Sequence, residues 1–369
     1  MKAELTRALP ASAQPQPLHG FTQAALEQWA RDRGASAGAA RVLARQQLAR
    51  QAGRLFGEAP GRALAAKAEL FFDAALPSAT VIEDPDGTVR FAVCLADGAT
   101  IETVAIHQPA RDTDATAGRQ NARWTICVSC QAGCARGCVF CETGRLGLVR
   151  NLTVAEIVQQ YALASRYLGA APRNVVFMGM GEPLDNLDAV LGAIEVLREH
   201  AGFAVPERRI TVSTVGIVSR MDEFFARTRA NLAVSLHALD SGVRLALLPV
   251  ARRWPLAELR AAIARAPRAV LLQWTLIDGV NASDSDADAL VAFCSGLDVR
   301  VNLIPLNPGP IAAQRAPPLE RCRAFQKRLA DAGVRCLLRL PHGQGVGGAC
   351  GQLAGSLRAA RGCNSASAD

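Results

Sequence analysis

The densest group of chemically reactive residues is a run of cysteines. Five of the eleven cysteines in this 369-residue chain fall between residues 127 and 141. Three of them, Cys134, Cys138 and Cys141, follow a Cys-x3-Cys-x2-Cys spacing. Thiolates from one short loop can bind three irons of a [4Fe–4S] cluster and leave the fourth iron open to a substrate or cofactor. The spacing therefore predicts a cluster-binding loop with one exchangeable iron position.

A structural zinc site is the alternative interpretation of the same stretch. Cys127 with Cys130, and Cys138 with Cys141, form two Cys-x2-Cys pairs of the kind that bind zinc. Their separation is shorter than in a typical zinc ribbon, and Cys134 would be left over. In the cluster interpretation Cys130 has no ligand role, so it is either a spectator thiol or an alternative redox partner.

The elements that must position these cysteines follow a strand-then-helix pattern from about residue 120. This pattern predicts an α/β barrel or open sheet of parallel strands, and ligands bind at the carboxyl ends of such strands. Unusual residues fall at those ends, in 179–182, 213–214, 235–237 and 307–308. The expected strands are 124–128, 174–178, 209–213, 231–236, 270–277, 299–304 and 334–340.

The rest of the chain divides into segments of different character. Residues 1–20 are rich in Pro and Gln and are expected to be disordered. Helical periodicity predicts a helical domain over 21–76, and alternating β-formers with two Asp-Gly turns predict a small β-meander over 77–118. The barrel should span 119–362 and end in a cysteine-containing loop, with 363–369 as a tail.

The composition and charge of the chain limit the classes of partner that it can have. Half of the residues are hydrophobic, the net charge is +8 and the isoelectric point is about 9.1. An excess of Arg suits a phosphate-rich partner such as RNA, although genome base composition can also produce it. No apolar run reaches the roughly 18–20 residues of a membrane span, and no signal peptide is evident. A cytoplasmic protein without membrane contact is expected.

Several motifs together resemble one family. They are CVSCQAGCARGCVFCETGRLGLVRNLT, VVFMGMGEPLDN, RRITVSTVGIV, AVSLHA, NLIPLNP and ACGQLAG, in this order. The cysteine spacing, with Phe140 before the last cysteine, resembles the radical SAM signature. The whole set is similar to the RlmN/Cfr family of radical SAM RNA methyltransferases over about residues 79–362. The resemblance implies a partial parallel (β/α) barrel with an N-terminal helical accessory domain and a small β-meander.

The resemblance also implies a reaction. Family members methylate an adenine ring carbon in RNA, and likeness to the RlmN branch favours carbon 2 over carbon 8. The substrate would be 23S rRNA, with tRNA as a second candidate, and two S-adenosylmethionine (SAM) molecules would be used per turnover. Cys350 would carry the methyl group, Glu102 would accept the ring proton, and Cys127 would release the product through a transient disulfide with Cys350. A flavodoxin or ferredoxin system would donate electrons to a monomeric enzyme.

The cofactor contacts are carried over in the same way. The cluster ligands would be the three spaced cysteines, and the residues expected to contact SAM are Gly181, Glu182, Ser213, Ser235, Leu236, His237 and Asn307. The chain also departs from the family pattern, because the segment PHGQGVGGACG before Cys350 has several glycines and no acidic residue. Two alternatives therefore stay open: a paralogue with another RNA target or position, and a non-catalytic RNA-binding or zinc-stabilised relative.

Overall fold

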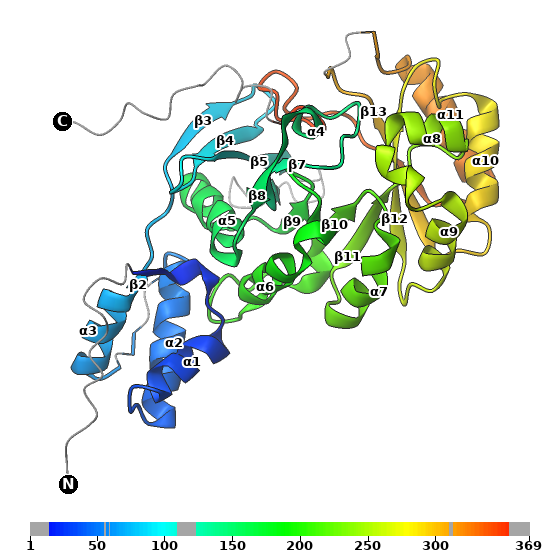
Figure 1. Ribbon diagram of the computed structural model, residues 1–369. Coiled ribbons are helices and arrows are strands. Elements are labelled where there is room, and N and C mark those ends of the chain that lie inside the picture. The colour runs from blue at the N-terminus through cyan, green and yellow to red at the C-terminus, as the bar shows by residue number, and fades with distance from the viewer. Residues whose placement is uncertain (1–14, 55–56, 59, 109–122, 310–312, 354–369) are drawn as a thin grey trace, which may run out of the picture.

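The computed structural model describes residues 15–54, 57–58, 60–108, 123–309 and 313–353 (Figure 1). The helical elements are η1 (Leu18–Gly20), α1 (Gln23–Arg31), α2 (Ala37–Gln51), α3 (Arg62–Phe71), α4 (Glu142–Leu146), α5 (Val154–Leu168), η4 (Pro183–Asn186), α6 (Leu187–Arg198), η5 (Glu207–Arg209), α7 (Val218–Arg227), α8 (Ser241–Leu247), η6 (Pro249–Arg252), α9 (Leu256–Ala264), α10 (Asp284–Cys294) and α11 (Leu319–Asp331). The strands are β1 (Gln16–Pro17), β2 (Phe72–Asp73), β3 (Ala79–Glu83), β4 (Val89–Cys94), β5 (Thr100–Gln108), β6 (Arg123–Cys127), β7 (Gln131–Cys134), β8 (Gly147–Asn151), β9 (Asn174–Phe177), β10 (Ile210–Thr214), β11 (Asn231–Ser235), β12 (Val270–Leu276), β13 (Val299–Pro305) and β14 (Cys336–Leu338). The boundary expected at residue 118 and the tail 363–369 lie outside the described residues.

One ten-stranded sheet organises the chain, in the order β14-β13-β12-β11-β10-β9-β6-β5-β4-β3. Neighbours from β6 to β14 pair in parallel, whereas β3, β4, β5 and β6 pair antiparallel. Each strand expected beyond residue 120 is therefore confirmed as a parallel neighbour. Figure 1 shows the curved sheet with the crossover helices along its outer side. The antiparallel meander extends this sheet, and residue pairing places Val104 of β5 opposite Cys127 of β6.

Local sequence explains the element ends. Thr153 and Glu156 form the expected capping box at the start of α5, and Gly169 ends that helix in the left-handed conformation. The parallel strands are buried on both faces, as in β12, where six of seven residues are buried. Both Asp-Gly turns of the meander have their glycines at positive φ, with Gly87 at 85° and Gly98 at 83°.

A second, smaller core holds the N-terminal helices together. Trp29, Leu43 and Phe72 pack in it, together with Leu18 from the segment that was expected to be disordered. That expectation is wrong for residues 15–20, because Leu18 is fully buried and its carbonyl accepts a hydrogen bond from Gln51 Nε2 at 2.5 Å. Residues 1–14 lie outside the described part of the chain. Within the part that is described, no helix has the length and apolarity needed to cross a bilayer.

Candidate active site

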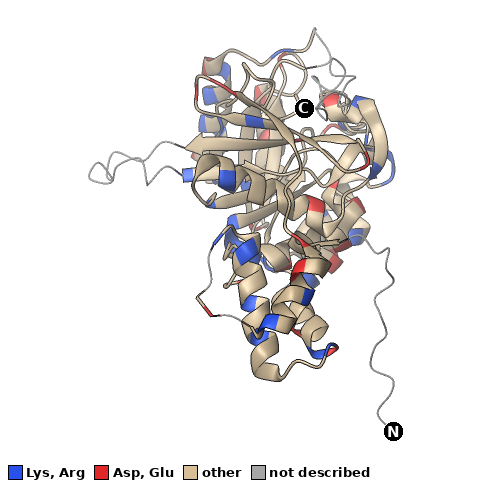
Figure 2. Cartoon of the chain, turned by 90° about the vertical axis from the view of Figure 1, so that its left-hand side faces the viewer, with Lys and Arg blue, Asp and Glu red and all other residues tan. Residues whose placement is uncertain are grey.

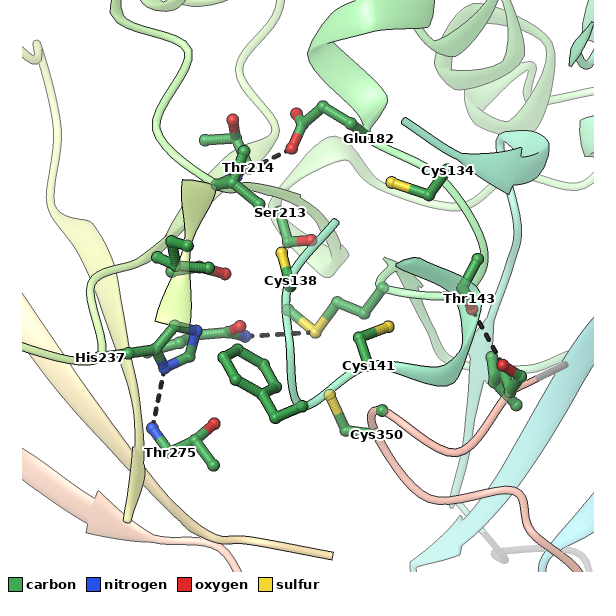
Figure 3. A pocket seen from close by; sticks show the side chains of 18 of the residues that line it. Cys134, Cys138, Cys141, Thr143, Glu182, Ser213, Thr214, His237, Thr275 and Cys350 are labelled. Atoms are coloured by element: carbon green, nitrogen blue, oxygen red, sulfur yellow. Dashed lines mark hydrogen bonds between the residues drawn. The ribbon is translucent and has the colours of Figure 1, made fainter. Parts of the chain in front are cut away.

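A cavity opens at the carboxyl ends of the parallel strands, with the three spaced cysteines on its wall (Figure 3). Cys134 is buried, and Cys138 and Cys141 are half-buried. Residues from the ends of β9 to β13 complete the wall, among them Glu182, Ser213, Ser235, His237 and Thr275. The sheet therefore brings the cysteine loop together with the polar residues that the sequence placed at its strand ends.

Buried polar side chains fix the cysteine loop. Asn186 Nδ2 donates to the carbonyls of Cys130 and Leu152, each at 2.8 Å. Gln160 accepts from Ser129 N at 2.7 Å and donates to Ser129 O at 2.9 Å. Arg136 pairs with Asp185, with Nε donating to Oδ2 and Nη2 donating to Oδ1. Since Asn186 and Gln160 satisfy backbone atoms of the loop and Arg136 ties it to Asp185, the loop has one defined path past the cavity.

Glycine is required where this loop crosses the end of β9. A Cβ added at Gly179 would lie 2.8 Å from the Val128 backbone, and one at Gly181 would lie 2.6 Å from Gln131 Cβ. Gly181 also has φ of 105°, which L side chains rarely adopt. The glycines of the GMGEP segment therefore allow close backbone approach rather than flexibility.

Gly181→Ala is expected to lower the free energy of unfolding by roughly 2–4 kcal/mol, because it adds a clash to backbone strain. Gly98→Ala is the matched control, since Gly98 has a similar φ of 83° with no atom within 4 Å of an added Cβ. Strain alone should cost about 1 kcal/mol there. Urea denaturation followed by circular dichroism measures both, and equal losses would show that the contact with Gln131 is unimportant.

Glu182 is the buried carboxylate of the cavity. Its Oε2 accepts from Val215 N at 2.8 Å and its Oε1 from Leu184 N at 2.9 Å. Burial raises the pKa of Glu182 to about 7, and these backbone hydrogen bonds oppose that rise. A carboxylate held in this way can bind a cationic amino group at the cavity wall.

His237 lies across the cavity from Glu182 (Figure 3). Its backbone has φ of 57°, and Asn281 Nδ2 donates to its carbonyl at 2.7 Å. Its Nδ1 accepts from Thr275 N at 2.9 Å, which places the ring proton on Nε2. Burial and the charge of Arg244 lower the pKa of His237 to about 3, so the imidazole is neutral. It can therefore donate a hydrogen bond without adding charge.

Two residues expected to contact SAM do not line the cysteine cavity. Leu236 is fully buried, and its N–H donates to Gln273 O at 3.0 Å. Asn307 lies outside the cysteine cavity; its Nδ2 donates to Cys350 O at 3.0 Å. Asn307 therefore positions the loop that carries Cys350.

Cys350 lies between two cavities. It lines the cysteine cavity, and it also lines a neighbouring cavity of about 350 Å³ whose wall includes Cys127. Cys350 has an exposed surface, yet desolvation by the surrounding protein, with the charge of Cys141 next, raises its pKa to about 11. Burial, with the charge of Cys350 next, raises the pKa of Cys127 to about 12. One thiol thus faces the predicted cluster ligands on one side and the second thiol on the other.

Glu102 lies beside these cavities and lines neither of them. It is fully buried on β5, two residues before Val104, which is opposite Cys127. Its Oε1 is 3.2 Å from Arg90 Nη1. Residues two apart on a strand share a face and are about 7 Å apart, so Glu102 points to the same side as Cys127.

Comparisons with known proteins agree with this geometry. A sequence profile of the Radical SAM superfamily matches residues 128–294. A probable RNA methyltransferase of Sorangium cellulosum is 45% identical, over 91% of this chain and 86% of the relative. A dual-specificity RNA methyltransferase RlmN of Syntrophobacter fumaroxidans is 39% identical, over 92% of this chain and 98% of the relative. The chain belongs to the RlmN family of radical SAM RNA methyltransferases.

A solved structure supports the RlmN-family fold over nearly the whole chain. The crystal structure of a radical SAM methyltransferase from Sphaerobacter thermophilus matches with a TM-score of 0.80 at 37% identity. The match covers 92% of this chain and 99% of that chain. The predicted α/β radical SAM fold is therefore confirmed.

The cysteine cavity fits the cofactors that the radical SAM superfamily implies, a [4Fe–4S] cluster and SAM. In the described residues no three His, Cys, Asp or Glu side chains converge on one metal ion. A cubane places each ligand sulfur on a different iron, so ligands spread around a cavity wall suit it. Cys127 and Cys130 lie apart from this wall, and Cys130 Sγ is directed at Met180 O in the core. The two Cys-x2-Cys pairs thus face different environments, which disfavours the zinc interpretation.

Sequence reasoning missed three residues of this RlmN-family site. Met178 and Gln273 line both cavities, and Arg339 lines the cavity that contains Cys127. The signal for Gln273 was a polar residue inside the apolar strand VLLQWTL. Arg339 gave no signal, because arginines are frequent throughout the chain. Its positive charge lowers the pKa values of Cys127 and Cys350, against the larger effect of burial.

The thiols of Cys127 and Cys350 are expected to react slowly with iodoacetamide. With a pKa of about 11, Cys350 has about 100-fold less thiolate at pH 8 than a thiol with the ordinary value of 9.0. The alkylation rate should therefore keep rising with pH up to about 11. Arg339→Gln should slow both reactions severalfold, whereas Arg335→Gln, which removes a partner of Asp298, should not. Peptide mass spectrometry gives the rates, and an unchanged rate in Arg339→Gln would contradict the charge effect.

Proposed function

We propose that this chain methylates a ring carbon of an adenine in RNA, with carbon 2 favoured, through a methylated Cys350. The substrate would be 23S rRNA, with tRNA as a second candidate. The position of Cys350 carries the proposal, because its thiol can reach a group in the cysteine cavity and a base beside Cys127. Lys and Arg residues recur along the N-terminal helices, which supports an RNA partner (Figure 2).

The walls of the cysteine cavity would hold the cofactors. Cys134, Cys138 and Cys141 would bind the cluster, while Gly181 and Glu182 would hold the amino group of SAM. Ser213, Ser235 and His237 would contact its ribose, carboxylate and adenine, with the backbone of Leu236 beside them. When bound, the two cofactors supply a methyl group and the radical chemistry that an electron-poor ring carbon requires.

The protein thiols would perform the transfer and the release. Cys350 would carry the methyl carbon as a thioether and become linked through it to the adenine ring. The Cys127 thiolate then attacks the Cys350 sulfur, and the electron pair of the sulfur–carbon bond moves to the carbon, which takes up a proton as the methylated base leaves. The remaining disulfide needs two electrons and two protons from a thiol reductant. A flavodoxin or ferredoxin system would reduce the cluster separately.

Glu102 would accept the ring proton. Its carboxylate shares a face with Cys127, which supports this role. Its complete burial beside Arg90 means that covering residues must move before a base can reach it. A Glu102→Gln variant that keeps full turnover would contradict the assignment.

The proposal is tested with anaerobically purified protein, SAM, a reducing system and transcripts of 23S rRNA and tRNA. Nuclease digestion and mass spectrometry should find one added methyl on adenosine, and chromatography against standards separates 2-methyladenosine from 8-methyladenosine. The 8-methyl product would support the carbon 8 alternative. Methylation of neither RNA by protein with an intact cluster would overturn the proposed substrate.

A further inference from the structure

The loop that carries Cys350 is attached to the β-meander by two carboxylates. Gly343 N donates to Asp86 Oδ2 at 2.8 Å, and Val346 N donates to Asp84 Oδ2 at 3.1 Å. His342 Nδ1 lies 3.5 Å from the same Asp86 oxygen. Both aspartates belong to the turn between β3 and β4, about 260 residues earlier in the sequence. The meander therefore provides the acidic groups that the sequence of the loop lacks.

A neutral attachment holds the opposite side of the loop. Asn307 Nδ2 donates to Cys350 O at 3.0 Å, and Asn307 Oδ1 accepts from Gln344 Nε2 at 2.8 Å. Gln352 Nε2 donates to Pro308 O at 3.0 Å. The two aspartates thus provide the charged half of the attachment, and hydrogen bonds to charged groups are stronger than those between neutral groups.

The glycines before Cys350 make this close contact possible. A Cβ at Gly345 would lie 2.7 Å from Asp84 Oδ2, and a Cβ at Gly343 would lie 2.7 Å from Thr88 Cγ2. The same stretch covers the meander face that holds Glu102, because Gly347 lies against Arg90 and Gly348 against Val104. The glycine-rich sequence is therefore explained by contact with the Asp84–Asp86 turn.

We propose that Asp84 and Asp86 are positioning residues that latch the Cys350 loop onto the meander. The latched loop holds Cys350 between the two cavities, and its release uncovers the Arg90–Glu102 side of the meander. The carboxylates do not touch the reacting atoms; they act through the backbone N–H groups of Gly343 and Val346. The consequence for methylation rests on the proposed function, whereas the latch itself does not.

The latch predicts faster loop opening when the carboxylates are removed. In the Asp84→Ala/Asp86→Ala double variant, amide hydrogen exchange across 342–350 should rise at least about tenfold. The Asp84→Asn/Asp86→Asn variant keeps neutral acceptors and should show an intermediate rate. Asp97→Ala is the matched control, since Asp97 occupies the other Asp-Gly turn and pairs with Arg150 instead of the loop. It should leave exchange in 342–350 unchanged.

A variant on the loop side keeps the proposal falsifiable if the turn itself is disturbed. Gly345→Ala should accelerate exchange to a similar extent, because its methyl group meets Asp84 while the turn keeps its own residues. Adding Asp84→Ala to Gly345→Ala should then accelerate exchange little further, because the contact with Asp84 is already lost. Unchanged exchange in both Gly345→Ala and the double alanine variant, or strictly additive effects, would overturn the latch.

Activity separates the latch from the proposed function. The latch variants should lower kcat for RNA methylation about tenfold with little change in KM, and the asparagine variant should recover part of it. If the wild-type protein methylates no RNA while the exchange results hold, the proposed function fails and the latch stands. Normal kcat in variants with fast exchange would instead refute the positioning role.

Discussion

Replacing Cys134, Cys138 or Cys141 by alanine is expected to remove the iron–sulfur cluster. Two remaining thiolates from one loop hold a cubane poorly, so each single variant should lose nearly all iron and sulfide. Each protein should stay folded, because the loop path is fixed by Asn186, Gln160 and the Arg136–Asp185 pair rather than by the thiols. Iron and sulfide analysis with absorbance spectra of anaerobic protein gives the result.

Cys130→Ala is the matched control for these three variants. Cys130 comes from the same stretch, but its side chain is 2% exposed in the core and lines no part of the cysteine cavity. The variant should keep its cluster and lose about 1 kcal/mol of stability from the small cavity that it creates. Cluster loss in Cys130→Ala combined with cluster retention in any of the other three would show that the ligands are assigned wrongly.

The parallel sheet could be predicted because its strands carry a strong local signal. Apolar runs such as 270–277 are bounded by turn residues and alternate with helices, and a strand buried on both faces needs that composition. The strand ends then follow from the geometry of parallel sheets. This is why the sequence alone predicts that Glu182, Ser213, Ser235 and His237 lie near one cavity.

Other features depend on contacts that no local pattern encodes. Leu18 is ordered by a small core and by Gln51, although its flanking sequence is polar and proline-rich. Asn307 lies at a strand end, yet its amide is used by the Cys350 loop. Glu102 was expected in a catalytic cavity, whereas pairing with Arg90 keeps it buried beside one. In each case a partner distant in sequence decides where the side chain points.

The other large effect concerns the thiols of Cys127 and Cys350, which line the same cavity. Removing Cys350 should stop the reaction before any bond to RNA forms. Removing Cys127 should stop it afterwards, because no thiol remains in place to attack the Cys350 sulfur. Cys127→Ala protein purified from cells should therefore carry covalently attached RNA, while Cys350→Ala and the double variant should not. Denaturing gels with and without nuclease, followed by mass spectrometry of the Cys350 peptide, reveal the adduct.

This asymmetry separates a reaction sequence from a static role for the two cysteines. A structural disulfide or a shared metal site would make the single variants alike, whereas sequential roles make them opposite. Cys130 is too far into the core to replace Cys127, since its thiol faces Met180 O rather than the cavity that contains Cys350. Cys127→Ala/Cys130→Ala should therefore carry as much RNA as Cys127→Ala alone. Sustained turnover in Cys127→Ala that disappears in the Cys127→Ala/Cys130→Ala variant would instead assign the release step to Cys130.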